Sequence, residues 1–408
     1  MHICFFTHYT EMAGGSNFSL FELIKNLNNL GVEVTLISPC YGEINKRLDA
    51  IGVRNKGFPF FPFKSGFYTW TTPDDTGLNW LKNRVKMQVN KMNAYKIARY
   101  LKDLQVDIVH TNCSVTCVGA KVARMLGIPH IWHIREYNVE DFGWSFIYGR
   151  ENSIHKIEQY SKELIFISHD LREKYKLACP SLKDHPIIYN GIDKKRFYYK
   201  KDKNSFFSND LCIAMSGGVQ RHKNQGELIQ AISLLPSKYK NHIKCVFIGP
   251  ADAEYLKELQ SFIGKHGLTK QIEFLGHRSD VNQLLHGAHI AVMASRCEAF
   301  GRVTVEYMMS GLAVIVSNTG ANPEIVADGQ SGLIYRYGDP KDLSEKIQWY
   351  MNHREQMAEI AMNGQQVALD RFTSDINTKN IYTLYRKILS KTTATRKFYK
   401  IKLSIFMY

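Results

Sequence analysis

Short apolar runs, each followed by a longer amphipathic segment, repeat along almost the whole chain, and this alternation constrains the fold more than any other feature. The first series reads HICFFTHY, GVEVTLISP, DIVHTNC, HIWHIRE and ELIFIS. The second series begins after residue 210 and reads LCIAMSGG, IKCVFIGP, IEFLGH, HIAVMAS, LAVIVSN and SGLIYRY. Strands that alternate with helices predict parallel sheets covered on both faces. Two such series therefore predict an α/β protein with two Rossmann-like domains.

A polar and basic stretch separates the two series. It reads KKRFYYKKDKNSFFSND, covers residues 194–210, and is interpreted as the connection between the domains. In open parallel sheets, ligands bind beyond the carboxyl ends of the strands, close to helix N-termini. The residues that directly follow each apolar run are therefore the first candidates for a functional site.

The chain carries 53 basic and 38 acidic residues, a net charge of +15, and the excess is spread over both halves. This charge suits nucleotide phosphates, other polyanions or an anionic membrane surface without choosing among them. The longest aliphatic runs, such as Leu312 to Val316, fall far short of the roughly 18 residues that span a bilayer. We therefore expect no integral membrane segment, and the N-terminus lacks the basic region of a signal peptide. The eight cysteines form no C-x-x-C pair and are expected to be buried free thiols in a reducing cytosol.

The segment EAFGRVTVE places Glu298 and Glu306 eight residues apart, with a helix expected to begin near Gly301. On one helix this spacing corresponds to about 12 Å along the axis, which exceeds the roughly 5 Å between the two carboxyl groups of a retaining glycosidase. It suits a site that holds the two ends of an extended ligand, with a diphosphate on the free N–H groups at the helix start. The alternative is one acidic residue favoured by the helix dipole and one glutamate that faces solvent.

The same segment carries a resemblance to a known family. The E-x7-E pattern, followed by a turn of small residues, a VIVS strand and G-x-x-x-E, is similar to family 4 of the retaining GT-B glycosyltransferases (glycosyl transferases group 1) of the bacterial polysaccharide-biosynthesis type. Four further elements occur in the order of that family: Gly14-Gly15-Ser16, the H-I-R-E around His133, YNGID at 189–193 and G-x5-K at 217–223. The resemblance thus extends over most of the chain.

The resemblance implies a GT-B fold, in which two Rossmann-like domains face a cleft and a C-terminal helix crosses back to the first domain. We expect residues 1–193 to form an N-terminal domain that binds the acceptor and a membrane. Residues 194–371 would form the domain that binds a nucleotide sugar, and residues 372–408 would hold the crossing helix and a basic, aromatic tail.

In the second domain the resemblance implies a donor site. Glu298 would hydrogen-bond hydroxyls of the donor sugar, and Glu306 would hold the ribose hydroxyls of the nucleotide. Lys223 would neutralise the diphosphate leaving group. Gly218 stands where the family usually has arginine, and Arg221 either supplies that charge or serves the surface. Backbone amides would complete the sugar and phosphate contacts, at Phe300, Gly301, Arg302 and Val303.

In the first domain the resemblance implies that His133 approaches the reacting sugar, where it would hydrogen-bond and stabilise charge. Arg135 and Glu136 are its expected companions. Gly14 and Gly15 follow the first apolar run and let the backbone approach a ligand at the start of a helix. Three other histidines border apolar runs and are interpreted as structural: His8, His110 and His130.

Two missing motifs narrow the chemistry. No G-x-G-x-x-G follows the first apolar run, which disfavours a dinucleotide-dependent oxidoreductase. The chain also lacks a D-x-D element of the kind that metal-dependent glycosyltransferases use. We therefore expect no metal and no cofactor, with a nucleotide-diphosphate sugar as co-substrate, because Lys223 and helix dipoles can replace the cation electrostatically.

A possible membrane face begins at residues 58–70, FPFFPFKSGFYTW, which hold seven aromatics in thirteen positions. Residues 80–102 hold seven basic residues and no acidic one. Apolar residues recur there at helical spacing, at Leu81, Val85, Val89 and Met92. An aromatic loop beside a cationic amphipathic helix suits an anionic membrane surface, whereas the alternative is core aromatics and a solvated helix face. The C-terminal TRKFYKIKLSIFMY repeats the pattern.

We therefore expect a retaining hexosyltransferase-type enzyme that moves a sugar from a nucleotide-diphosphate donor to a lipid-linked or glycan acceptor, as in lipopolysaccharide or capsule assembly. It would be cytoplasmic and peripheral on the inner face of the plasma membrane. Two alternatives stay open: a GT-B sugar-nucleotide epimerase, and a catalytically silent membrane-bound subunit that stabilises a partner transferase. Nucleic acid is not an expected partner, because no recognition motif accompanies the charge.

Overall fold

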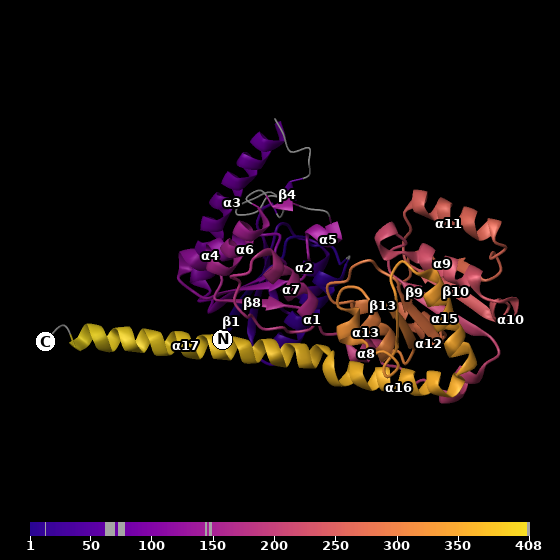
Figure 1. The fold of residues 1–408 in the computed structure, drawn as a ribbon. Helices are drawn as coiled ribbons and strands as arrows, with labels where there is room; N and C mark the ends of the chain where they lie inside the picture. Colours follow the sequence, from indigo (N-terminus) through magenta and orange to yellow (C-terminus); the bar gives the residue numbers. More distant parts are fainter. Residues whose placement is uncertain (13, 62–69, 72–77, 143–144, 147–148, 406–408) are drawn as a thin grey trace. The chain divides into compact units, whose positions relative to one another are not determined.

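The computed structural model describes residues 1–405 except 13, 62–69, 72–77, 143–144 and 147–148. The chain divides into two compact units, and each is described by itself (Figure 1). Unit 1 comprises Met1–Gly191 and Ser374–Tyr408, and unit 2 comprises Ile192–Thr373. The chain therefore passes between the units twice, at 191–192 and at 373–374.

Unit 1 is built on a parallel sheet of six strands in the order β3-β2-β1-β5-β6-β8. The strands are β1 (His2–Phe6), β2 (Glu33–Ser38), β3 (Arg54–Gly57), β5 (Ile108–Asn112), β6 (His130–Ile134) and β8 (Glu163–Phe166). A separate antiparallel pair joins β4 (Trp70–Thr71) to β7 (Ser145–Phe146). Every residue of β1, β5 and β6 is buried, which explains why these strands are continuous apolar runs rather than alternating ones.

Helices cover both faces of this sheet. They are α1 (Gly15–Asn29), α2 (Glu43–Asp49), α3 (Leu78–Asp103), α4 (Val118–Leu126), α5 (Val139–Phe142), α6 (Arg150–Gln159), α7 (His169–Ala178) and α17 (Ser374–Ile405). Side chains of β1 point alternately to the two faces. Ile3 and Phe5 pack into a core shared with α1 and α17, whereas Cys4 and Phe6 pack into a core shared with α3 and α4.

Unit 2 repeats the architecture with a parallel sheet in the order β11-β10-β9-β12-β13-β14. Its strands are β9 (Leu211–Ser216), β10 (Ile243–Ile248), β11 (Ile272–Phe274), β12 (Ile290–Met293), β13 (Ala313–Ser317) and β14 (Leu333–Tyr335). Its α-helices are α8 (Lys194–Phe197), α9 (Gln225–Leu234), α10 (Ser237–Lys240), α11 (Ala253–Lys265), α12 (Val281–His286), α13 (Arg302–Met309), α14 (Asn322–Ile325), α15 (Pro340–Asn352) and α16 (Arg354–Arg371). Two 3-10 turns are η1 (Lys203–Phe207) and η2 (Arg221–Lys223). The expectation of an α/β protein with two Rossmann-like domains is confirmed.

The stretch 194–210 is not the free connection that its polarity suggests. It forms α8 and η1 and packs onto unit 2, because Phe197 and Phe206 are 5% and 1% exposed. Ser310 Oγ donates a hydrogen bond of 3.1 Å to the carbonyl oxygen of Phe197, which ties α8 to the end of α13. Two buried aromatic rings thus make a basic segment part of a folded unit.

The two passages of the chain between the units run side by side. Ile192 N donates to the carbonyl oxygen of Phe372 over 2.9 Å. Gly191 of the YNGID motif leaves no room for a side chain, because a Cβ there would lie 2.5 Å from Ser374 Cα. Beyond this point α17 enters unit 1 and packs beside α1 (Figure 1), so the expected return of a C-terminal helix to the first domain is confirmed.

Three strands of unit 1 have no counterpart among the apolar runs. β3 reads RNKG and alternates between exposed and half-buried residues, as an edge strand can. β4 and β7 contain two residues each, which is too short for a periodic signal. The described part of the chain has no helix that is both long and apolar enough to cross a bilayer.

The aromatic segment 58–70 divides between core and surface. Phe60 is 3% exposed and lies in the core with α3, and Phe58 packs against the same core, so here the core interpretation is correct. Phe61 is 37% exposed. Residues 62–69 and the side chain of Trp70 lie outside the described part, as do the side chains of the C-terminal basic and aromatic segment.

The eight cysteines are free thiols, as expected, but they are not all buried. Five are buried, Cys212 and Cys297 are half-buried and Cys40 is exposed.

Candidate functional site

The strand order of unit 2 reverses at β9, because β10 and β11 lie on one side of it and β12, β13 and β14 on the other. Parallel sheets bind ligands at such a switch point, beyond the carboxyl ends of the strands. β9 is followed by Gly217, Gly218 and the turn η2, which ends at Lys223. β12 is followed by the loop that contains Glu298. The topology therefore brings these two segments to the same edge of the sheet.

Lys223 and Glu298 form an ion pair at this switch point. Lys223 Nζ donates to Glu298 Oε1 over 2.5 Å, and the two side chains are 29% and 16% exposed. Burial raises the pKa of Glu298, but the charge and hydrogen bond of Lys223 outweigh it and hold this pKa below its ordinary value. The carboxylate is therefore ionised, and the pair offers one positive and one negative group to a ligand.

The backbone around Glu298 is shaped by β13 and the loop after it. Ala321 N donates to the carbonyl oxygen of Glu298 over 2.9 Å. Gly320 has φ +58°, and a Cβ there would lie 2.5 Å from the carbonyl oxygen of Glu298 and 2.7 Å from its nitrogen. A residue other than glycine cannot make this approach without a shift of the loop. The G-x-x-x-E element, which begins at Gly320, thus positions Glu298.

The start of α13 supplies the expected backbone amides. Gly301 is its N-cap, in the left-handed region with φ +72°, and a Cβ there would meet Asn322 Oδ1 at 3.2 Å. Amides in the first turn of a helix have no carbonyl acceptor within that helix, so they can bind an anion. Phe300 is 2% exposed and packs edge-on against Phe372, with ring centres 5.7 Å apart, and Val303 is half-buried.

Glu306 lies one turn further along α13, and its side chain is 14% exposed. Arg302 Nη2 is 3.7 Å from Glu306 Oε1. Burial raises the pKa of Glu306, although the charges of Arg302 and Arg196 act in the opposite direction. The neighbouring Tyr307 is buried and accepts a hydrogen bond of 2.5 Å from Ser216 N, which anchors α13 to the end of β9.

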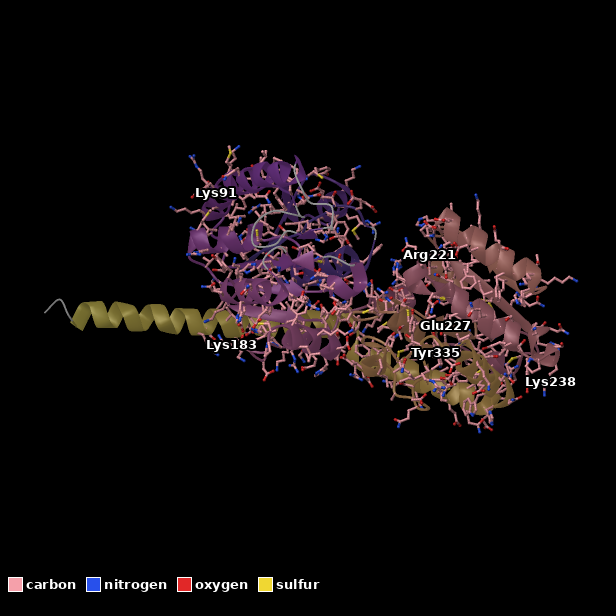
Figure 2. The ribbon with its side chains drawn as sticks, turned by 45° about the horizontal axis from the view of Figure 1, so that its top comes forward. Lys91, Lys183, Arg221, Glu227, Lys238 and Tyr335 are labelled. Atoms are coloured by element: carbon pink, nitrogen blue, oxygen red, sulfur yellow. The ribbon has the colours of Figure 1, made fainter. Side chains whose placement is uncertain are left out.

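Arg221 contacts residues of α11. Its guanidinium forms an ion pair with Glu258 of α11, with Nη1 donating over 2.8 Å, and lies 5.3 Å from the centre of the Tyr255 ring. The side chain is 62% exposed, and Figure 2 labels it. These contacts favour the surface role over a second phosphate contact. Gly218 O accepts from Gln225 Nε2 over 2.9 Å, so the loop at this position is held from α9.

A cavity of about 410 Å³ opens beside the Arg221 segment. Among its lining residues are Asn224, Glu227, Tyr255 and Tyr337. Burial raises the pKa of Glu227, although a hydrogen bond of 3.1 Å from the hydroxyl of Tyr335 lowers it (Figure 2). This cavity lies next to the expected phosphate region and contains none of the expected donor residues.

Unit 1 has its switch point at β1, which lies between β2 and β5. Gly14 follows β1, has φ +83° and is the N-cap of α1, and Gly15 is the first residue of that helix. Ser16 Oγ lies 2.6 Å from the hydroxyl of Tyr9. Cys113, directly after β5, also has a positive φ of 75°. The two glycines thus stand at the start of a helix beside the switch point.

His133 lies fully buried in β6, where it pairs in register with Asn112 of β5. Its Nδ1 is 3.2 Å from His110 Nε2, and His110 Nδ1 is 2.6 Å from the hydroxyl of Tyr385 on α17. We call Tyr385, His110 and His133 the histidine relay. Burial lowers the pKa of both histidines well below the ordinary value, and the charge of Arg135 lowers it further, so both rings are neutral.

The histidine relay was not evident from the sequence. His110 is interpreted there as structural, and Tyr385 is 275 positions away from it. The return of α17 into unit 1 is what brings them together. His130 does behave as a structural residue, since it is buried and contacts Thr111 Oγ1 at 2.8 Å and Ser161 Oγ at 3.3 Å.

Arg135 is the companion that contacts His133. Its Nη2 lies 3.3 Å from His133 Nδ1, and its Nε donates to Asn112 Oδ1 over 2.6 Å. Its Nη1 donates to Asn190 of the YNGID motif. The guanidinium is thus fixed by two side-chain amides from different segments.

Glu136 takes a different direction. Its Oε1 accepts hydrogen bonds from Ser114 N at 2.5 Å and from Ser114 Oγ at 2.6 Å. Burial raises the pKa of Glu136 to about 7, although the hydrogen bonds from Ser114 act to lower it. This carboxyl group closes the turn after β5 rather than supporting His133.

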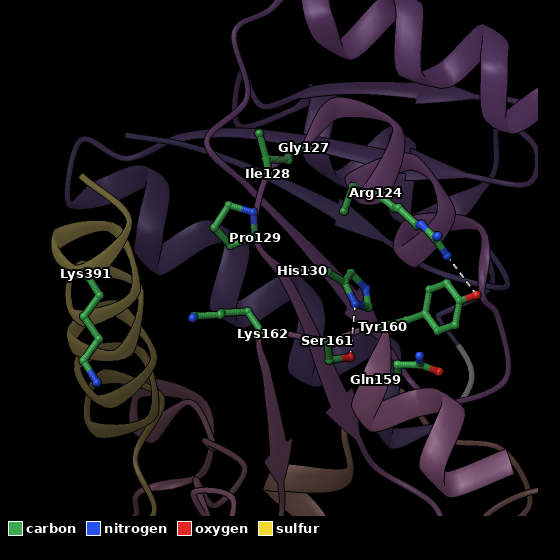
Figure 3. Close-up of a pocket in the computed structure, with 11 residues that line it drawn as sticks. Arg124, Gly127, Ile128, Pro129, His130, Gln159, Tyr160, Ser161, Lys162 and Lys391 are labelled. Atoms are coloured by element: carbon green, nitrogen blue, oxygen red, sulfur yellow. Dashed lines mark hydrogen bonds between the residues drawn. The ribbon is translucent and has the colours of Figure 1, made fainter. Parts of the chain in front are cut away.

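A cavity of about 570 Å³ lies elsewhere in unit 1 (Figure 3). It is bordered by the amino ends of β6 and β8, opposite the carboxyl ends where the candidate site lies. Its basic lining residues are Arg124 of α4, Lys162 directly before β8 and Lys391 of α17. Arg124 Nη1 donates to the hydroxyl of Tyr160 over 3.0 Å, and Lys162 points toward the helix that carries Lys391 (Figure 3).

Over the described ranges of both units, no group of three or more His, Cys, Asp or Glu side chains could hold a metal ion.

Two α/β units, each built on a parallel six-stranded sheet, with the last helix of the chain packed on the first unit, form the GT-B fold. A comparison with solved structures agrees. HepE of Anabaena superposes with a TM-score of 0.77 over 94% of this chain and 99% of its own, at 21% sequence identity.

Sequence comparison identifies the family. The profile of Glycosyl transferases group 1 matches residues 199–367, and that of Glycosyltransferase Family 4 matches residues 13–196. An uncharacterized glycosyltransferase of Methanocaldococcus jannaschii is 31% identical over an alignment of 286 residues that covers 67% of this chain and 74% of that protein. The capsular polysaccharide biosynthesis glycosyltransferase CapM of Staphylococcus aureus is 25% identical over 66% of this chain and 72% of its own. The chain belongs to the glycosyltransferases whose two domains these profiles describe.

Proposed function

We propose that this protein transfers a hexosyl-type sugar from a nucleotide-diphosphate donor to a glycan acceptor, with retention of the anomeric configuration. The observation that carries the proposal is the Lys223–Glu298 ion pair at the switch point of unit 2, beside the amides of α13. An ammonium group can bind the anionic phosphates of a nucleotide-diphosphate sugar, and a carboxylate can accept hydrogen bonds from the sugar hydroxyls.

Donor binding would exchange the partners of this pair. A diphosphate oxygen replaces the carboxylate at Lys223 Nζ, and the released Glu298 accepts hydrogen bonds from sugar hydroxyls. The positive charge then lies where negative charge grows as the glycosidic bond breaks, which stabilises the transition state more than the bound donor. The ligand-free ion pair holds both side chains in place, so little reorganisation is needed when the donor arrives.

Glu306 is proposed to hold the ribose. It lies on the helix whose first amides would bind the phosphates, and its carboxylate can accept from two vicinal hydroxyls. The nearby Arg302, at 3.7 Å, favours the ionised form that accepts such hydrogen bonds.

Retention would follow an internal-return course. The bond between the anomeric carbon and the phosphate oxygen breaks, and the acceptor oxygen bonds to that carbon on the same face. The acceptor proton passes to the leaving phosphate oxygen, so no separate general base is required. We propose that this chemistry needs no metal ion, with Lys223 and the amides of α13 taking its electrostatic role.

The relatives support the choice of ligands. HepE has been crystallised with UDP and with UDP-glucose, and CapM is named for capsular polysaccharide biosynthesis. A uridine donor and an acceptor from surface-polysaccharide assembly are therefore the first to examine.

The test is turnover of a panel of UDP-, GDP-, CDP- and ADP-sugars, with release of nucleoside diphosphate as the readout and with EDTA as a parallel condition. We expect slow hydrolysis of donors with one base, unchanged by EDTA, and a first-formed free sugar of the donor's anomeric configuration by proton NMR. The opposite anomer contradicts retention. An epimerised donor without diphosphate release indicates the epimerase, and no turnover of any donor or acceptor favours the silent subunit.

We also propose that α3 contacts an anionic membrane, which suits a lipid-linked acceptor and a peripheral location on the cytoplasmic side. Val85, Met92 and Tyr95 are 58%, 61% and 59% exposed, although all three are apolar or aromatic. Exposed basic residues lie among them: Lys91, Lys96 and Arg99. Lys91 is labelled in Figure 2. Apolar groups flanked by lysines and arginines are typical of helices that lie in a bilayer interface.

The opposite face of α3 fixes the helix to unit 1. Ala94, Ile97 and Leu101 are buried in the core with α4. Asn90 accepts from Phe61 N at 2.8 Å and donates to Phe61 O at 3.0 Å. The exposed apolar side chains therefore belong to a helix with a defined outer face.

The membrane proposal is tested by sedimentation with vesicles of phosphatidylglycerol or of phosphatidylcholine. The wild type should sediment with the anionic vesicles alone, and a Val85→Ser/Met92→Ser variant should stay in solution. Leu177→Ser is the matched control, because Leu177 is 82% exposed on α7 of the same unit and should not affect binding. Equal sedimentation of all three proteins would contradict the proposal.

A further inference from the structure

His133, the last residue of the histidine relay, has a buried ring nitrogen without a hydrogen-bond partner among the described residues. His133 is 0% exposed, and its Nε2 has no hydrogen-bond partner within the described part of the chain. Buried polar atoms of folded proteins are nearly always hydrogen-bonded, and an exception at a candidate site indicates a group that a ligand satisfies. Whether Nε2 donates or accepts depends on which ring nitrogen carries the proton.

The contacts of the other nitrogen decide this. Arg135 Nη2 lies 3.3 Å from His133 Nδ1, and a guanidinium can only donate. His133 Nδ1 is therefore an acceptor without a proton. A neutral imidazole has one proton on its two nitrogens, so it lies on Nε2.

The positions of the protons on His110 and Tyr385 follow from their contacts in the same way. His110 Nε2 faces the lone pair of His133 Nδ1 at 3.2 Å, so it donates and carries the proton of its own ring. His110 Nδ1 then accepts, and its partner at 2.6 Å, the hydroxyl of Tyr385, donates. All hydrogen bonds of the relay thus run in one direction, from α17 through β5 to β6.

We propose that Tyr385 and His110 are positioning residues that act together with the guanidinium of Arg135 to hold His133 as the tautomer with its proton on Nε2, so that His133 donates a hydrogen bond to a ligand oxygen. The identification of that oxygen as part of a sugar substrate rests on the function proposed above, whereas the direction of the hydrogen bonds in the relay does not. The C-terminal helix, which returns from unit 2 to pack on unit 1, therefore contributes to the hydrogen-bonding character of a side chain in the first sheet.

Removal of the Tyr385 hydroxyl should weaken this control. In Tyr385→Phe, His110 Nδ1 loses its donor, so the His110 tautomer with its proton on Nε2 loses the hydrogen bond that favours it, and the two tautomers come closer in free energy. In molecules whose His110 proton lies on Nδ1, His110 Nε2 no longer donates to His133 Nδ1. Arg135 alone then donates to His133 Nδ1, so the His133 tautomer that donates from Nε2 is less strongly favoured.

The experiment is NMR of the full-length protein labelled with 15N in its histidine rings, where couplings identify the protonated nitrogen. Signals are assigned by their loss in His133→Asn and His110→Gln. We expect protons on Nε2 of both histidines in the wild type and a detectable population of His110 protonated on Nδ1 in Tyr385→Phe. Tyr382→Phe, a half-buried tyrosine on the same helix, is the matched control and should give the wild-type pattern.

Kinetics supply the second readout once a donor is known. Tyr385→Phe should lower kcat about fivefold to tenfold with the donor KM little changed. His110→Gln keeps an N–H donor toward His133 and should retain more activity than His110→Leu. A wild-type His133 protonated on Nδ1, or a Tyr385→Phe spectrum identical to that of the wild type, would overturn the proposal whether or not the protein transfers sugar. The expected spectra without any transfer would instead reject the proposed function alone.

Discussion

The two units share a strand order but differ in the electrical character of their switch points. In unit 2 the groups that meet are charged and partly exposed, an ammonium and a carboxylate at 2.5 Å. In unit 1 the groups of the histidine relay are neutral, fully buried and hydrogen-bonded to one another. Burial of a charge costs far more than burial of a neutral, hydrogen-bonded ring. The buried guanidinium of Arg135, which contacts His133, is stabilised by hydrogen bonds to Asn112 and Asn190.

The difference assigns different tasks to the same topology. A charged pair near the surface can exchange partners with a charged ligand, as binding of a diphosphate requires. A buried neutral relay cannot supply charge, but it can fix the direction of one hydrogen bond.

Neutralisation of Glu298 should break the charged site. Glu298→Gln keeps the shape of the side chain and leaves Lys223 without its counter-charge, and an amide accepts sugar hydroxyls more weakly than a carboxylate. We expect turnover to fall about 100-fold to 1000-fold. Glu258→Gln is the matched control, because Glu258 also pairs with a basic residue of unit 2, at the surface. Equal losses in both variants, measured as initial rates, would contradict the assignment.

The pH dependence of stability tests whether the buried carboxyl group of Glu136 in unit 1 is protonated. Burial raises its pKa from 4.5 to about 7, so the folded state holds a proton that the unfolded state releases between these values. Stability should therefore fall as pH rises from about 4.5 to 7, by up to about 3 kcal/mol from this group. Glu136→Gln should remove that part of the slope. Denaturant melts of both proteins from pH 5 to 8 measure it, and two parallel stability curves would rule out a protonated Glu136.

The strand signal explains how far sequence predicted the fold. Strands with helices on both faces are continuous apolar runs, and β1, β5, β6 and β13 are all visible as such. The edge strand β3 has no apolar pattern to find. The prediction that 194–210 is a connection is wrong because the lysines of this segment outnumber the two phenylalanines that fold it onto unit 2.

The candidate site was visible only where its residues lie close in sequence or match a family pattern. The E-x7-E element and the lysine after β9 are such cases, and the structure adds that Lys223 contacts Glu298. The relay partner of His110 lies on the last helix, and no local pattern connects them. The sequence also does not reveal that Gly320 lies close to the backbone of Glu298, because this contact depends on the positive φ of Gly320 and on the path of the loop.

A substitution at Gly320 tests whether its close approach to the Glu298 backbone shapes the donor site. Gly320→Ala introduces a Cβ 2.5 Å from the carbonyl oxygen of Glu298 and should cost at least about 2 kcal/mol of stability and most of the donor affinity. Gly329→Ala is the matched control, with φ +71° but open space around the new Cβ. It should cost about 1 kcal/mol and leave donor binding intact. Thermal melts and titrations that fail to separate the two variants would show that Gly320 does not shape the site.

Arg221 should give the smallest effect. Its guanidinium is occupied by Glu258 and Tyr255 at the surface of unit 2, so Arg221→Ala should change donor turnover by no more than about twofold. Initial rates at several salt concentrations measure this. A loss comparable to that of the Glu298 variant would place Arg221 in the donor site instead.

The central claim is that unit 2 binds a nucleoside diphosphate through Lys223. Calorimetric titration with UDP, GDP, CDP, ADP and NAD tests it on the wild type, on Lys223→Ala and on Lys238→Ala, an exposed lysine of the same unit (Figure 2). We expect that one nucleoside diphosphate binds the wild type and Lys238→Ala equally, and Lys223→Ala at least about tenfold more weakly. Binding of none of them, or equal binding to all three proteins, would contradict it.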